Sequence, residues 1–81
     1  MIKNNFYVEI GKRIKEERLK AGLTREKLAN MSHISDKFLY DIEVGNKGMS
    51  AETLHKITKA LGVSADRLLN SSDVLLESAT T

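Results

Sequence analysis

Three polar residues near the middle of the chain, Lys37, Tyr40 and Asp41, recur at positions three and four apart. On an α-helix this spacing brings side chains to one face. If Leu39 and Ile42 point into a core, the three polar residues point away from it. An ammonium group can donate to guanine O6 or N7, and a carboxylate can accept from cytosine N4. A tyrosine ring can contact a thymine methyl group. This set of groups therefore suits base edges in the major groove of DNA.

Further polar residues around this face are candidates for phosphate contacts. Arg25 and Ser35 stand at predicted helix starts, where backbone N–H groups favour anions. Asp36 lies on an edge of the same face, where its carboxylate also suits the helix dipole. The candidate DNA-binding residues are Arg25, Ser35, Asp36, Lys37, Tyr40, Asp41, Asn46 and Lys47.

A local pattern that positions these residues occurs four times. It consists of an apolar residue, then Ser or Thr, then Leu four residues after the hydroxyl. The hydroxyl is an N-cap, and the two apolar residues form a hydrophobic staple. The sets are Leu23-Thr24-Leu28, Ile34-Ser35-Leu39, Met49-Ser50-Leu54 and Val63-Ser64-Leu68. They predict helices at 25–31, 36–44, 51–61 and 65–70.

An earlier helix is predicted over 9–21, ended by Gly22. With no proline and no alternating β-type segment, the five predicted helices indicate an all-α fold. The segment Ser32-His33-Ile34 leaves room only for a turn, and Ala29 suits a close helix crossing. The second and third helices therefore predict a helix-turn-helix. The residues expected inside its corner are Leu28, Ile34, Leu39 and Ile42.

Length and composition indicate one globular domain. The chain has 81 residues, of which 41% are hydrophobic and 30% charged. We expect a lead-in at 1–8, the helix-turn-helix domain at 9–70 and a polar tail at 71–81. Within the tail, Val74-Leu75-Leu76 suits either a frayed end or an interface with a second copy.

The absence of cysteine excludes a disulfide or thiolate site, and the two histidines, His33 and His55, are too scattered for a metal site. We expect neither a cofactor nor a metal. No apolar run resembles a signal peptide or a membrane span, so we expect a cytoplasmic protein without a membrane partner. No nucleophile–base pair or paired carboxylates indicate an enzyme. The segment Gly45-Asn46-Lys47-Gly48 lacks the spacing of a phosphate-binding P-loop.

The net charge of +2 is weak evidence for a polyanionic partner. Residues 1–47 hold ten Lys or Arg against seven Asp or Glu, whereas residues 48–81 hold three against four. The positive excess lies in the half with the predicted helix-turn-helix. A chance asymmetry on a solvated surface explains these counts equally well.

Over residues 11–69 the sequence resembles the lambda-repressor-like family, also called Cro/C1-type or XRE. The resemblance rests on five pieces in order: R-x-x-x-G-L-T, L-A, I-S, I-E-x-G and A-L-G-V-S-x-x-x-L-L. It implies a compact five-helix domain that binds operator double-stranded DNA, usually as a homodimer on a palindromic site. The third helix would read bases, with Asp36, Lys37 and Asp41 at the reading positions. It implies a phosphate contact for Arg25.

The resemblance also supports a structural ion pair between Arg18 and Glu43, which we expect where the first helix packs on the third. The chain departs from the family in having His33 where glycine is usual. Histidine tolerates a left-handed conformation better than most residues.

A sequence-specific DNA-binding regulator that acts as a dimeric repressor is therefore the leading hypothesis. The acids at the reading positions leave a second one open, a protein-interaction module of the same fold with Phe38 and Tyr40 as anchors. An antitoxin-type regulator that binds both an operator and a partner protein combines the two.

Overall fold

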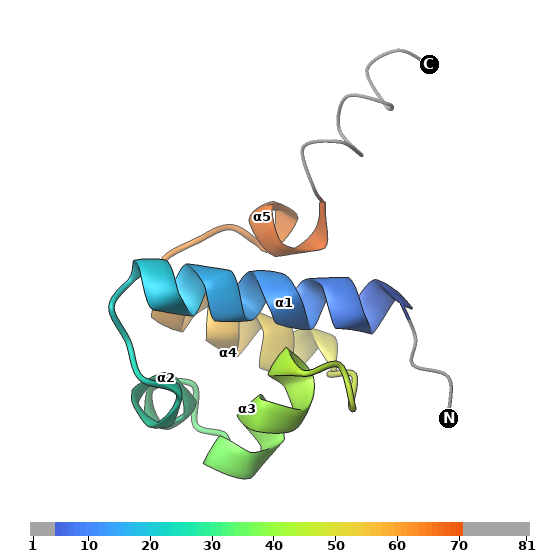
Figure 1. Cartoon of the computed structure of the whole chain (residues 1–81). Coiled ribbons are helices and arrows are strands. Elements are labelled where there is room, and N and C mark those ends of the chain that lie inside the picture. The colour runs from blue at the N-terminus through green and yellow to red at the C-terminus, as the bar shows by residue number, and fades with distance from the viewer. Residues whose placement is uncertain (1–4, 71–81) are drawn as a thin grey trace.

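The computed structural model describes residues 5–70, in which helices are joined by short loops (Figure 1). The described part contains no strand, which confirms the predicted all-α fold. The helices are α1 (Asn5–Lys20), α2 (Arg25–Met31), α3 (Asp36–Glu43), α4 (Ala51–Leu61) and α5 (Ala65–Leu69). Their limits agree with the predicted ones to within one residue, except at the start of α1.

The predicted hydroxyl caps set the starts of four helices. The Ser35 Oγ accepts a hydrogen bond from the Phe38 backbone N–H at 3.0 Å. The other three caps likewise accept from the N–H three residues later; they are Thr24, Ser50 and Ser64. The apolar residue before each cap packs against the core, as the staple requires. These residues are Leu23, Ile34, Met49 and Val63.

The start of α1 differs from the expectation. The helix begins at Asn5, so residues 5–8 belong to it and not to a lead-in. A Cβ on Gly48 would come within 2.6 Å of the Tyr7 ring, and one on Gly45 within 2.7 Å of Val8. The first turns of α1 therefore pack on the loop after α3. The predicted tail at 71–81, with its apolar triplet at 74–76, lies outside the described residues.

The long helix α1 crosses the centre of the molecule, with α4 behind it, α5 on one side and α2 and α3 on the other (Figure 1). It packs against α3 and α5, while α2 packs against α3 and α4. The hydrophobic core takes residues from all five helices. Its buried members are Ile10, Ile14, Leu28, Ala29, Leu39, Ile42, Ile57 and Leu68.

The predicted helix-turn-helix is present. Ala29 of α2 is buried in the core, and Ile34 in the turn packs partly buried against the same core. His33 takes the left-handed conformation, with φ of 57°. This confirms that histidine takes the left-handed conformation in the turn.

The back of α3 is joined to α1 by the predicted buried ion pair. Arg18 Nε donates to Glu43 Oε2 at 2.7 Å and Arg18 Nη2 to Glu43 Oε1 at 3.1 Å. A further guanidinium N–H donates to the Leu23 carbonyl oxygen at 2.9 Å. A Cβ on Gly11 would overlap the carbonyl oxygen of Ile42, so the two helices touch backbone to backbone there. These contacts fix the orientation of α3.

Candidate nucleic-acid interface

The first residues of α2 and α3 meet at the surface in an ion pair. Arg25 Nε donates to Asp36 Oδ1 at 2.7 Å, and Arg25 Nη2 lies 3.4 Å from Asp36 Oδ2. The Arg25 hydrogen bond lowers the pKa of Asp36, and Asp36 in turn raises the pKa of Arg25. Both groups therefore remain charged at neutral pH, beside the helix starts where backbone N–H groups favour phosphate.

Two cations lie near the Tyr40 ring on the outer face of α3. The Arg25 guanidinium is 5.1 Å from the centroid of its ring, and Lys37 Nζ is 5.9 Å from it. The tyrosine is 41% exposed, and the Lys37 side chain is 78% exposed. Lys37 and Tyr40 thus face the solvent, as the helical spacing predicts. They present a donor and an aromatic ring on one surface.

Asp41 does not project into solvent, which corrects the expectation from the helical spacing. The residue is 3% exposed, and Lys37 Nζ lies 3.0 Å from each of its carboxylate oxygens. Lys47 Nζ lies 3.7 Å from Oδ2. The hydrogen bond from Lys37, with the nearby Lys47 charge, lowers the pKa of Asp41.

The loop after α3 explains why Asp41 is covered. The backbone N–H groups of Asn46 and Lys47 lie 2.8 and 3.3 Å from the Asp41 carbonyl oxygen, so the chain folds back over this residue. The helical spacing of α3 alone carries no information about this loop. Asp41 forms the floor of the surface rather than part of its outer edge.

The remaining predicted residues lie around this surface. Ser35 is exposed, and its hydroxyl oxygen caps α3. Asn46 and Lys47 are exposed in the loop. Phe38 is half-buried against the core, which leaves Tyr40 as the more accessible aromatic residue. We call the following set the recognition face: Arg25, Asp36, Lys37, Tyr40, Asp41 and Lys47.

Two residues that support this surface were not predicted. Tyr7 and Val8 pack under the loop that carries Asn46 and Lys47, at Gly48 and Gly45. The sequence carries a signal for them, because Tyr7, Ile10 and Ile14 continue one helical face upstream of residue 9.

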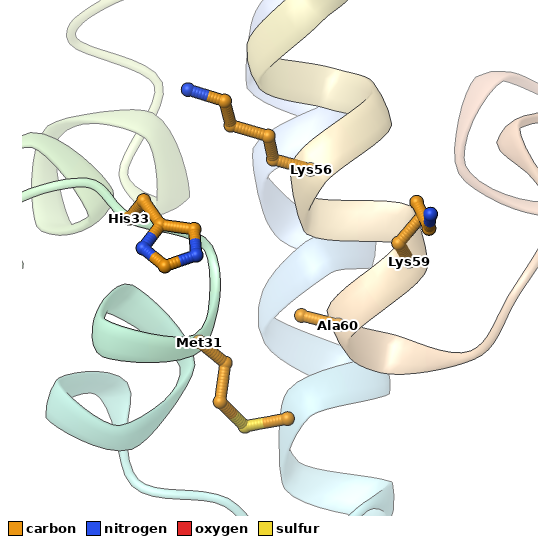
Figure 2. A pocket seen from close by; sticks show the side chains of 5 residues that line it. All are labelled: Met31, His33, Lys56, Lys59 and Ala60. Carbon is orange, nitrogen blue, oxygen red and sulfur yellow. The ribbon is translucent and has the colours of Figure 1, made fainter.

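A separate hollow of about 560 Å³ lies at the other end of α2 (Figure 2). Met31 and His33 line one side, across from α4. The side chains of α4 that line it are Lys56, Lys59 and Ala60. Arg25 begins α2 and Met31 ends it, so the hollow is separated from the recognition face by the length of that helix.

Within residues 5–70, no group of three or more His, Asp or Glu side chains is arranged to hold a metal ion. No helix in that part is long and apolar enough to cross a membrane.

Comparisons with known proteins agree with this geometry. A helix-turn-helix domain family matches residues 11–74. The chain is 33% identical over 72 residues to the control protein C.BamHI of Bacillus amyloliquefaciens, covering 88% of this chain and 89% of that protein. It is 33% identical over 73 residues to the HTH-type transcriptional regulator ImmR of Bacillus subtilis, covering 90% of this chain and 58% of ImmR.

The fold is similar to the crystal structure of the restriction-modification controller protein C.AhdI from Aeromonas hydrophila. The TM-score is 0.78 at 28% identity, over 80% of this chain and 98% of C.AhdI. The family match spans most of the chain and includes both helices of the motif. The chain belongs to the XRE-type helix-turn-helix family of DNA-binding transcription regulators.

Proposed function

We propose that this protein is a sequence-specific regulator that inserts α3 into the major groove of operator DNA. The observation that carries the proposal is the pair of solvent-facing side chains on α3, Lys37 and Tyr40, beside the first turn of α2. An α-helix with its side chains is about 10–12 Å in diameter, so a helix such as α3 fits the major groove, which is about 12 Å wide.

The contacts divide into two kinds. Lys37 and Tyr40 would reach base edges, because they project farthest from the core on α3. Arg25 and Ser35 would hold phosphates at the two helix starts, and Asn46 and Lys47 would hold them from the loop. Base contacts specify the site, whereas phosphate contacts fix the register of the protein on the duplex.

We further propose that the protein acts as a homodimer on a palindromic operator, as a repressor in the cytoplasm. The names of its relatives, a control protein and a transcriptional regulator, support a regulatory role. In a dimer of this motif, two copies of α3 enter successive major grooves about 34 Å apart.

Selection from a pool of random duplexes, followed by binding measurements at several salt concentrations, tests this proposal. We expect one palindromic sequence to be enriched, and log K to fall linearly with log salt as phosphate contacts release counterions. Lys47→Ala should weaken binding to all sequences alike. Lys59→Ala, at the hollow beside α4, is the matched control and should leave affinity unchanged. A pool without any enriched site would contradict the proposal.

The same selection addresses the alternative of a protein-interaction module. The exposed Tyr40 ring is the observation that favours it, because aromatic residues often anchor protein partners. DNA affinity that is insensitive to Lys37→Ala and Tyr40→Ala would support this alternative over α3-mediated DNA binding.

A further inference from the structure

The hollow between α2 and α4 carries positive charge at its rim (Figure 2). Within residues 5–70, its lining includes Lys56 and Lys59 but no acidic side chain. In the same part of the chain neither lysine has an ion pair. The two lysines of the recognition face, in contrast, both lie beside Asp41. The hollow therefore presents cations that no acid of the described chain neutralises.

The other end of the hollow is apolar. Met31 ends α2 with its side chain directed toward α4, where Ala60 lines the hollow (Figure 2). The flexible thioether side chain of a methionine adapts to apolar groups of different shapes. Lys56 is half-buried, so part of its aliphatic stem is covered, while its nitrogen extends toward the His33 side in Figure 2. The hollow thus offers an apolar surface next to a cationic one.

We propose that this hollow binds a segment of a partner protein in which an acidic side chain stands beside an apolar one. The acid would pair with Lys56 or Lys59, and the apolar side chain would cover Met31. Arg25 begins α2 at the recognition face and Met31 ends it at the hollow, so a partner bound here leaves α3 accessible. The inference goes beyond the proposed function, because it does not depend on DNA binding.

The openness of the hollow favours a protein segment over a small molecule. Three of its five lining residues are exposed: Met31, His33 and Lys59. A small-molecule site usually buries roughly 70–90% of its ligand, whereas a small ligand in this hollow would stay hydrated on its outer side. A protein partner is not limited in this way, since its neighbouring residues can exclude water from the contact.

The test begins with a selection from a library of short random peptides, with the full chain as the target. We expect the enriched peptides to place Asp or Glu within a few positions of Leu, Met or Phe. One enriched peptide is then synthesised with a fluorescent label, and its affinity is measured by anisotropy at several salt concentrations. Octanoate, which combines a carboxylate with an apolar chain, is the small-molecule competitor.

Charge reversal locates the acidic side chain of the peptide. Lys59→Glu and Lys12→Glu change the net charge equally, and both lysines are exposed, but Lys12 lies on α1 and does not line the hollow. Lys59→Glu should weaken the peptide about fivefold or more at low salt, because it replaces an attraction by a repulsion. The effect should shrink at high salt, which screens both. Lys12→Glu should change the affinity far less.

Truncation of the methionine locates the apolar side chain of the peptide. Met31→Ala should weaken the peptide several-fold at every salt concentration, because it removes apolar contact and no charge. A general loss of structure would not separate the two variants by their salt dependence. Thermal melting establishes that each variant is folded, which the exposure of Met31 and Lys59 leads us to expect.

Four results would overturn the inference. The selection enriches no acidic and apolar peptide; Lys12→Glu weakens binding as much as Lys59→Glu; neither Lys59→Glu nor Met31→Ala weakens it; or octanoate binds as tightly as the peptide and displaces it, which would make the hollow a small-molecule site. None of these results bears on the proposed function, because the selection of DNA duplexes is a separate measurement.

Discussion

Two arginine–carboxylate pairs hold the two sides of α3, and they have the same bond in different surroundings. In each, an arginine Nε lies 2.7 Å from a carboxylate oxygen. The Arg18 and Glu43 side chains behind α3 are 9% and 3% exposed. The Arg25 and Asp36 side chains in front of it are 38% and 47% exposed.

The difference shows that the solvent exposure of an ion pair, and not its bond length, decides how much free energy is lost when the pair opens. We call Arg18–Glu43 the inner pair and Arg25–Asp36 the outer pair. Opening the inner pair leaves charge in the protein interior, which is strongly unfavourable. Opening the outer pair returns both groups to water, where such pairs contribute little. The inner pair therefore fixes α3 in the fold, whereas the outer pair can open at little cost, as a phosphate contact of Arg25 in the proposed function would require.

The largest effect is expected from breaking the inner pair. Glu43→Gln leaves the Arg18 charge buried without its counter-ion and should lower the free energy of unfolding by about 3–5 kcal/mol. Chemical denaturation measures this loss. Asp36→Asn should lower the free energy of unfolding far less. Equal losses for the two variants would contradict the distinction between the pairs.

A smaller loss is expected from separating the helices that the inner pair joins. Gly11→Ala places a Cβ against the Ile42 carbonyl oxygen, so α1 and α3 must move apart and Arg18 must move relative to Glu43. We expect a loss of about 1–3 kcal/mol in denaturation experiments. The control, Lys15→Ala at an exposed position of α1, should be near neutral. A stable Gly11→Ala variant would show that the close contact is not required.

The smallest effect concerns the pH dependence of the outer pair. Because Arg25 lowers the pKa of Asp36 below its ordinary value of 3.8, the pair contributes stability above that pH. The contribution is lost as pH falls through the lower pKa of the folded state. The Tm difference between wild type and Asp36→Asn should therefore be steady at neutral pH and vanish in strong acid. A difference that grows on acidification would contradict this assignment.

The helix limits could be predicted because capping is local. Each hydroxyl bonds an N–H three residues away, so the signal and its effect lie within one turn, as at Ser35 and Phe38. The start of α1 lacked such a signal. The spacing of Tyr7, Ile10 and Ile14 is compatible with a longer helix, but it does not show that Tyr7 and Val8 pack against a loop some 40 residues away in the chain.

Only part of the candidate site could be predicted, again because the sequence pattern reports local contacts and not those between distant segments. The helical period placed Lys37 and Tyr40 on the solvent side, and the structure agrees. The period did not reveal that the following loop covers Asp41, or that Arg25 pairs with Asp36 across the turn.

Selection from random duplexes with Lys37→Ala tests most directly whether α3 reads bases. The variant should lose its preference at one base pair of each half-site, by roughly 1–3 kcal/mol, and keep the preferences at the other positions. An enriched sequence identical to that of the wild type at every position would contradict the reading role assigned to α3.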